Sequence, residues 1–369
     1  MTNDADMRAS KRTELKPIAA AVTAAAVAVS LLAGCSSGAK EEQPAPTPSV
    51  PSRNASRPPS SAPPTKATEP PAPEPNAFAP YVDTSLKPSY DLLRSAQETG
   101  VKEYNLAFVS PGGGCTPKWG GRQELGDNPV ARQADALRAK GGDVRISFGG
   151  QSGHELARVC GSVDKLVRAY TKVIDAYDLT KVDFDIEGPA LTDKKANTLR
   201  AQAIARLQKQ HPDLDVSFTL PVLPSGLNRH AVAVLENAKK SGARVSAVNV
   251  MAMDYGSYYD GDMGEYAIAA ATATQKQIKK ALGIRRDAAA WKTVAVTPMI
   301  GVNDVEVEVF TPADAVELKR FADKKGLGRL SMWSAARDKP CQGGANSKAV
   351  ATCSSTKGKT NAFMRAFTG

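Results

Sequence analysis

From residue 78 onward, short runs of apolar and β-branched residues alternate with longer stretches in which apolar positions recur at helical spacing. Such alternation is typical of parallel βαβ units, whose buried strands are covered by helices. The runs predicted as strands are 78–82, 104–109, 144–148, 182–186, 216–220, 245–253, 294–299 and 330–333. The stretches predicted as helices lie near 89–98, 130–140, 161–176, 192–210, 229–241, 265–282 and 312–325. Eight strands separated by helices favour an α/β fold of the (β/α)8 TIM-barrel type, with its chemistry at the carboxyl ends of the strands.

The N-terminal residues have a different pattern. Basic residues precede an apolar run from Ile18 to Ala33, which is shorter than the ~20 residues that a membrane-spanning helix needs. A positive flank, a short apolar core and small residues at its end are typical of a secretory signal. The ending Leu-Ala-Gly-Cys resembles a bacterial lipobox, which implies a signal peptide over 1–35 and a lipid on Cys35. This predicts an anchor at the extracellular face of a bacterial cell membrane. An ordinary signal peptide with an incidental cysteine is the alternative.

Residues 36–77 are rich in Pro, Ser, Ala and Thr and contain very few large apolar side chains. Such a segment cannot bury enough surface to offset its ordering entropy, so we expect a disordered linker. Its prolines favour extended conformations, which makes it a spacer. The remaining residues, 78–369, suit one large α/β barrel.

The net charge of +10 would suit a nucleic-acid-binding protein. However, Lys and Arg are scattered and the chain carries an export signal, so nucleic acid is not an expected partner. With Cys35 lipidated, an even number of cysteines remains for an oxidising compartment, which favours disulfides. The expected pairs are Cys115–Cys160 and Cys341–Cys353. No CxxC motif is present, and we expect a monomer that requires no metal and no cofactor.

The strongest chemical signal is the segment DFDIE at 183–187. Because side chains alternate along a strand, Asp183, Asp185 and Glu187 face one side, which in a barrel is the interior. Like charges this close raise the pKa of at least one carboxyl group. A carboxylic acid that stays protonated near neutral pH is what a glycosidase needs to protonate its leaving group.

Two other readings of this segment are possible. A calcium-binding loop of the EF-hand type would need Glu at its twelfth position, where this chain has Lys194. A solvated edge strand would not carry the apolar residues that alternate with the acids. The barrel strand is therefore the favoured interpretation.

Four short motifs occur in order on four predicted strands. The acidic segment 183–187 resembles the end of the signature of glycoside hydrolase family 18, and SFGG at 147–150 resembles that family's Ser-x-Gly-Gly motif. The segment MAMDY at 251–255 is similar to the family's sixth-strand motif, Met-x-Tyr-Asp, and Trp333 ends the last predicted strand, where the family has a Trp. The chain thus resembles family 18, of the chitinase type, over nearly all of 78–369.

The resemblance implies a role for each matching residue. Glu187 would be the general acid, Asp185 would orient the 2-acetamido group of the substrate, and Asp183 would tune Asp185. In this family the substrate's own acetamido group replaces the enzymic nucleophile, so no second catalytic carboxylate is needed. The substrate-binding positions implied by the resemblance are Met251, Met253, Asp254 and Trp333.

The chain departs from the family pattern in two places. Thr180 and Lys181 replace the Asp-Gly that opens the acidic signature, low on the strand and away from the barrel mouth. Met253 stands where the family has Tyr. Since Tyr255 shares a face with Met253 if the strand continues, we predict that Tyr255 supplies the missing hydroxyl. Asp254 reaches the site only if the strand ends near Met253.

The expected activity is cleavage of β-1,4 bonds in polysaccharides or oligosaccharides that contain N-acetylglucosamine, such as chitin. The alternatives are an endo-β-N-acetylglucosaminidase acting on glycans and a lectin-like barrel that binds chitin without cutting it. The presence of both Glu187 and Asp185 argues for catalysis. Trp119, in the Gly-rich loop after the second predicted strand, is either a platform for a sugar ring or a packing residue.

Overall fold

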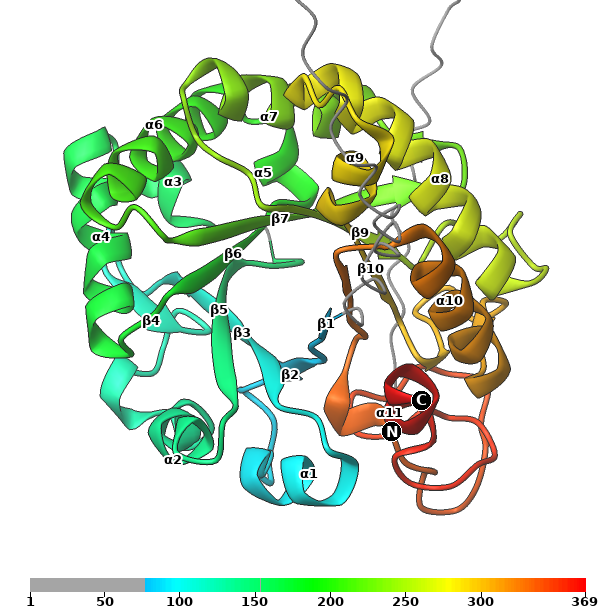
Figure 1. The fold of residues 1–369 in the computed structure, drawn as a ribbon. Coiled ribbons are helices and arrows are strands. Elements are labelled where there is room, and N and C mark those ends of the chain that lie inside the picture. Colours follow the sequence, from blue (N-terminus) through cyan, green and yellow to red (C-terminus); the bar gives the residue numbers. More distant parts are fainter. Residues whose placement is uncertain (1–76, 153) are drawn as a thin grey trace, which may run out of the picture. The chain divides into compact units, whose positions relative to one another are not determined.

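A computed structural model of the chain describes residues 77–152 and 154–369 (Figure 1). The predicted signal peptide, the lipidation site Cys35 and nearly all of the predicted linker lie outside the described residues. Within the described part, none of the helices combines the length and the apolar character needed to cross a bilayer.

The centre of the fold is a curled, mostly parallel sheet in the order β1-β13-β10-β9-β7-β6-β5-β3-β2. Its strands are β1 (Ala77–Phe78), β2 (Tyr81–Asp83), β3 (Glu103–Pro111), β5 (Asp143–Gly149), β6 (Lys181–Asp185), β7 (Asp215–Leu223), β9 (Ala247–Ala252), β10 (Val294–Pro298) and β13 (Arg329–Leu330). The short strands β4 (Pro117–Trp119) and β8 (Gly226–Leu227) pair antiparallel with β3 and β7, while β11 (Gly301–Val302) and β12 (Val309–Phe310) form a separate hairpin.

The sheet closes through its first strand. β1 pairs with β13 and β2 pairs with β3, and only two residues separate β1 from β2. Pro80 stands at this break, where it has no N–H to donate but its carbonyl accepts from Asn105 at 2.9 Å. Counting β1 and β2 as one interrupted strand gives, for the described chain, the predicted (β/α)8 TIM barrel.

Helices surround the ring of strands (Figure 1). The main ones are α1 (Leu92–Thr99), α2 (Ala134–Arg138), α4 (Val163–Ala176), α6 (Lys194–Gln210), α7 (Arg229–Lys240), α8 (Met263–Leu282) and α10 (Pro312–Lys325). Shorter ones are α3 (Leu156–Val159), α5 (Gly188–Thr192), α9 (Asp287–Thr293), α11 (Ala362–Thr368) and the 3₁₀ turns η1 (Leu125–Asp127), η2 (Ala131–Gln133) and η3 (Ala335–Arg337). α10 shows the local causes clearly: Thr311 and Asp314 form a capping box, and Gly326 ends the helix with φ +67°.

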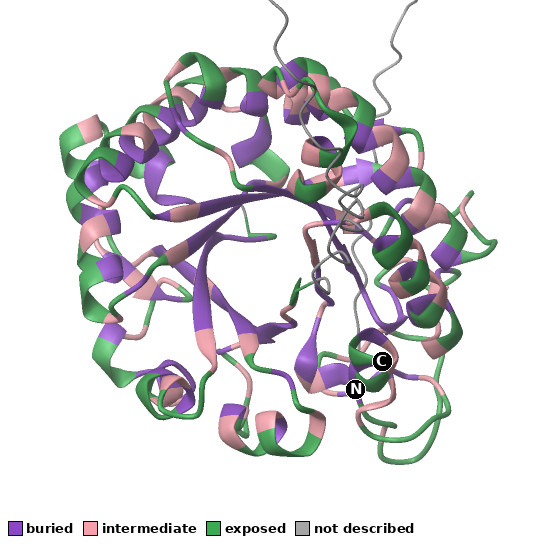
Figure 2. Ribbon diagram, viewed as in Figure 1, coloured by how far each residue is buried: buried purple, intermediate pink, exposed green. Residues whose placement is uncertain are grey.

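The two faces of the strands carry different residues. The outward face is apolar and packs under the helices, as where Phe148 stacks on Phe184 with ring centroids 5.3 Å apart and both contact Tyr170 of α4. The inward face carries buried polar groups, among them Ser147 and Asp183. Figure 2 shows the strands buried and the outer surfaces of the helices exposed. The interior of the barrel is therefore the polar region from which a site can be built.

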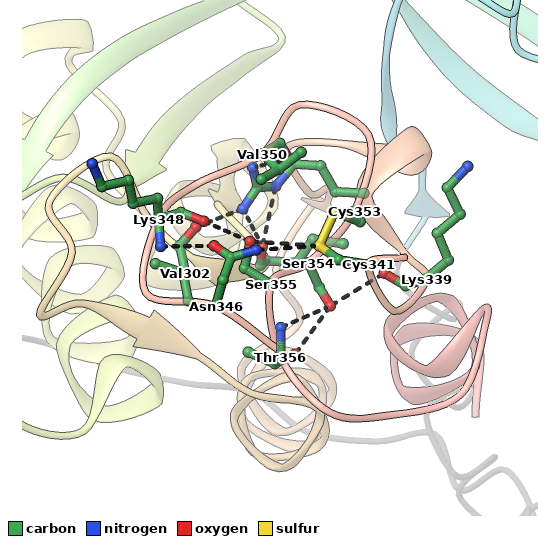
Figure 3. Close-up of a disulfide and its surroundings, with 12 residues drawn as sticks. Val302, Lys339, Cys341, Asn346, Lys348, Val350, Cys353, Ser354, Ser355 and Thr356 are labelled. Carbon is green, nitrogen blue, oxygen red and sulfur yellow. Dashed lines mark hydrogen bonds between the residues drawn. A yellow bond between two sulfur atoms is a disulfide. The ribbon is translucent and has the colours of Figure 1, made fainter. Parts of the chain in front are cut away.

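Both predicted disulfides are present. Cys115–Cys160 joins the β3–β4 connection to the end of α3, with Cα atoms 4.5 Å apart. Cys341–Cys353 closes a loop after the last strand, with Cα atoms 5.0 Å apart (Figure 3).

Candidate active site

A cavity of about 600 Å³ opens at the carboxyl ends of the barrel strands. Its lining is contributed by the last residues of several strands and by the loops that follow them. The residues that line it are Tyr81, Phe108, Gln151, Asp185, Glu187, Thr219, Pro221, Val222, Leu223, Asn228, Met251, Met253, Asp254, Thr297, Met299, Asp304, Val305 and Trp333. This is the end of the barrel at which the sequence predicted the chemistry.

Asp183 lies below the cavity, fully buried in the barrel interior. Four hydroxyl groups donate to its carboxylate: Tyr81 at 3.0 Å, Ser147 at 2.7 Å, Ser217 at 2.6 Å and Thr219 at 2.9 Å. These donors come from strands on both sides of β6, because Ser147 pairs with Asp183 from β5 and Ser217 pairs with it from β7. The network fixes a negative charge beneath the next inward residue, Asp185.

Asp185 and Glu187 form a hydrogen-bonded carboxyl pair at the mouth of the barrel. Burial, with the charges of Glu187 and Asp183, raises the pKa of Asp185 well above its usual value. Burial also raises the pKa of Glu187 to about 7; its hydrogen bond with Asp185 opposes this rise and the charge of Asp254 adds to it. The pair therefore retains a proton near neutral pH, as a general acid requires. The Oδ1 atom of Asp185 is buried and has no hydrogen-bond partner in the structure.

The SFGG segment brings β5 against the carboxyl end of β6. Gly149 has φ +101°, and a side chain there would collide with the backbone oxygen of Asp185. Gly150 has φ +94° and donates its N–H to the same oxygen at 3.2 Å, while a Cβ at Gly150 would lie 2.8 Å from the ring of Phe108. These two glycines therefore allow the close approach that places Asp185 and Phe108 at the cavity.

Asp254 follows β9, which is separated from β6 by β7 alone. β9 ends at Ala252, and Asp254 has φ +51°, which turns its side chain into the cavity. Its Oδ1 accepts from the backbone N–H of Val305 at 3.0 Å. Buried Glu308 accepts from the N–H of Gly256 at 2.8 Å and holds the turn from behind. The condition that the sequence set for Asp254, an early end of the strand, is met.

The structure places two predicted site residues elsewhere. Tyr255 does not line the cavity, because the turn at Asp254 interrupts the strand alternation; its ring packs between Tyr259 and Tyr266, with centroids 5.5 and 6.2 Å away. Trp119 is buried and donates to the hydroxyl of Tyr177 at 2.7 Å. Both positions correct the sequence prediction: Tyr255 offers the cavity no hydroxyl, and Trp119 is a packing residue.

The other predicted positions meet at the cavity. Met251 and Met253 line it together with Trp333, whose ring stacks on Phe108 at 5.6 Å and contacts Tyr81 at 6.0 Å. The sequence interpretation missed several lining residues: Phe108, Gln151, Thr219, Asn228 and Thr297. Strand alternation would have identified the two threonines, which lie on the inward face of β7 and β10. Among the described residues, no group of three His, Cys, Asp or Glu side chains is placed to hold a metal ion.

Chitinases are among the known proteins to which this chain is similar. No family model matches the chain. The probable bifunctional chitinase/lysozyme of Escherichia coli (strain K12) is 36% identical over 285 residues, which cover 73% of this chain and 32% of the relative. This chain thus spans about a third of that relative's length.

Solved structures match over a larger share of their length. The catalytic domain of the hyperthermophilic chitinase from Pyrococcus furiosus is 34% identical, with a TM-score of 0.72 over 81% of this chain and 97% of that domain. Catalytic-site mutants of active domain 2 of that organism's thermostable chitinase, complexed with chito-oligosaccharides, match with the same identity and TM-score over 96% of their chain. With this identity over nearly the whole solved domain, and with the acidic strand and the glycine pair at the cavity, the chain belongs to the family-18 chitinases of the glycoside hydrolases.

Proposed function

We propose that this chain hydrolyses β-1,4 bonds next to N-acetylglucosamine in chitin and its oligosaccharides, with retention of configuration. The observation that carries the proposal is the Asp185–Glu187 pair, which lies in a cavity above buried Asp183 and has raised pKa values. The complex of the P. furiosus chitinase domain with chito-oligosaccharides supports the same substrate class.

The proposed first step breaks the bond between C1 and the glycosidic oxygen. Glu187 gives its proton to that oxygen, and the acetamido carbonyl of the same sugar forms a new bond to C1. Asp185 orients the acetamide and balances the positive charge of the cyclic intermediate. Because the nucleophile is already attached to the sugar, the step gains from proximity.

The second step returns the enzyme to its starting state. A water molecule gives a proton to the Glu187 carboxylate and its oxygen attacks C1, which breaks the bond to the acetamido oxygen. Two displacements at C1 leave the product with the configuration of the substrate. Trp333 and the two cavity methionines would contact the apolar face of the sugar.

The test compares the full chain with its Glu187→Gln variant on N-acetylglucosamine oligomers. Loss of the general acid should lower kcat roughly 10²–10⁴-fold. The control is Glu306→Gln, because Glu306 is exposed, lies on a loop near the cavity and does not line it. In the parent, kcat/KM should fall as pH rises through the Glu187 pKa of about 7, and the first product should be the β-anomer. Binding without cleavage by the parent would instead establish a lectin.

We further infer that the mature chain is held at the outer face of a bacterial cell membrane by a lipid on Cys35. The basis is the sequence alone: an apolar segment of signal-peptide length that ends in Leu-Ala-Gly-Cys. The Pro-rich segment after it would act as a spacer between the membrane and the barrel.

A further inference from the structure

Arg337, the last residue of η3, is a buried cation beside the cavity wall. It is 1% exposed, and all its hydrogen bonds go to backbone carbonyls. Its Nε and Nη2 donate to Ile300 at 3.2 and 3.0 Å, Nη2 also donates to Val302 at 2.6 Å, and Nη1 donates to Val350 at 2.7 Å. One guanidinium thus ties the segment after β10 to the disulfide-closed loop.

The charge of Arg337 has no ion-pair partner among the residues that the structure describes. The contrast is Arg200, which is equally buried but paired with Glu155 at 2.7 Å. Buried cations are normally paired, because removing a charge from water is costly. Burial accordingly lowers the pKa of Arg337 to about 10, opposed by the charges of Asp304 and Asp254. Neutral donors also form hydrogen bonds with carbonyl groups, so these bonds alone do not account for a full positive charge at this position.

Two of the three carbonyl groups that Arg337 holds, those of Ile300 and Val302, belong to the segment that runs along the active-site cavity from Met299 to Val305. Ile300 donates its N–H to the carbonyl of Trp333 at 3.0 Å, and Val302 donates to the carbonyl of Ser354 at 2.9 Å, beside Cys353 (Figure 3). Three residues further on, Val305 donates to the Asp254 carboxylate. A displacement of this segment would therefore move the hydrogen-bond donor that orients Asp254.

The electrostatic surroundings of Asp254 are otherwise negative. Burial of Asp254 raises its pKa, and the charge of Asp304 raises it further. The charge of Asp254 in turn raises the pKa of both Glu308 and Glu187. The backbone N–H groups of Val305 and Asp304 lower the pKa of Asp254, and the charge of Arg337 lowers it further. Its field thus opposes the tendency of these crowded carboxyl groups to take up protons.

We propose that Arg337 is a positioning residue for the glycosidase reaction: it holds the 300–305 segment against Asp254 and keeps the Asp254 carboxylate charged beside the reacting sugar. The proposal rests on the proposed function, in which positive charge develops on that sugar. A carboxylate close to this charge stabilises it only while ionised.

The experiment compares Arg337→Gln, which still donates hydrogen bonds but is neutral, with Arg337→Lys, which keeps the charge. Both variants lose the planar fork, so we expect kcat on chito-oligosaccharides to fall roughly tenfold to a hundredfold while KM changes little. The pH profile of kcat/KM separates the two roles. Without the cation, Asp254 takes up a proton at higher pH, so the acid limb of Arg337→Gln moves upward. In Arg337→Lys that limb stays in place, and the alkaline limb, which follows Glu187, stays in place in both.

A second change isolates the geometry. Cys341→Ser with Cys353→Ser frees the loop that carries Val350 while Arg337 remains, so kcat should fall with no movement of the acid limb. If Arg337→Gln and Arg337→Lys lose the same fraction of kcat/KM at every pH, the proposal is overturned and the proposed function still stands. A shift of the acid limb of the kcat/KM profile in Arg337→Lys would also overturn the proposal. If Arg337→Gln does not fold, the acid limb of Arg337→Lys is the measurement that decides. A parent that cleaves no oligomer would refute the proposed function itself.

Discussion

The buried ion pair between Glu155 and Arg200 permits a quantitative prediction. Each side chain is 1% exposed, and the guanidinium contacts both carboxylate oxygens, at 2.7 and 3.2 Å. Tyr170 donates to the same carboxylate at 2.9 Å, and Arg200 also donates to Asn197 at 2.6 Å. The pair lies next to the glycine turn of the active site, because Gly149 faces the Glu155 side chain.

The perturbation is Arg200→Met, which keeps a similar volume and removes the charge. It leaves the Glu155 carboxylate buried and unpaired, which costs about 3–5 kcal/mol. With an unfolding entropy of ~2.1 cal/mol/K per residue over residues 77–369, that loss lowers Tm by about 5–8 °C. Adding Glu155→Gln removes the stranded charge, so the double variant should recover most of the lost stability.

Urea unfolding of the four members of this double-mutant cycle measures the effect. The matched control is Arg94→Met, because the Arg94–Glu98 pair has the same 2.7 Å separation but side chains that are 74% and 41% exposed. That variant should unfold at nearly the same urea concentration as the parent, because an exposed ion pair contributes little to stability. The reasoning is refuted if Arg200→Met loses less than about 1 kcal/mol, or if the double variant is as unstable as the single one.

Two further predictions concern the glycine turn and the membrane anchor. Gly149→Ala should destabilise the fold by at least about 2 kcal/mol and lower kcat/KM about a hundredfold, because the new methyl group meets the backbone oxygen of Asp185; Gly100→Ala, with φ +74° and open space around it, should lose only about 1–2 kcal/mol and keep its activity. Equal effects of the two substitutions on turnover would contradict this account. Cys35→Ser should abolish incorporation of labelled fatty acid and release the chain from the membrane fraction of a bacterial host; a parent chain that takes up no label would disprove the anchor.

The fold was largely predictable because its signals are local. α10 occupies the predicted range 312–325, since its cap, its first-turn proline and its terminal glycine are all adjacent in sequence. The predicted first strand, 78–82, is interrupted at Pro80, and the predicted last strand, 330–333, is regular only over Arg329–Leu330. Strand ends depend on partners from distant parts of the chain, which a local pattern does not contain.

The acidic strand was predictable for the same reason, whereas Phe108 was not. β6 is regular from Lys181 to Asp185, so strict alternation carries its carboxylates inward. Strict alternation would place Phe108 on the same face of β3 as Leu106, which lies in the core. The register of β3 shifts between Ala107 and Val109, and this irregularity turns Phe108 toward the cavity instead. Such a bulge is set by the neighbouring strand and by the close contact with Gly150.

The choice between Asp254 and Tyr255 shows where alternation stops being informative. Strand alternation would place Tyr255 on the same face as Met251 and Met253, yet Asp254 is the residue that lines the cavity. Two contacts decide this: Val305 donates to Asp254 from 51 residues away, and Glu308 accepts from Gly256 across 52 residues. Val305 belongs to the 300–305 segment that Arg337 holds and Glu308 follows it closely in sequence, so the orientation of Asp254 is a tertiary property. It follows that substitutions in this segment should change catalysis even though they leave the family motif on β9 untouched.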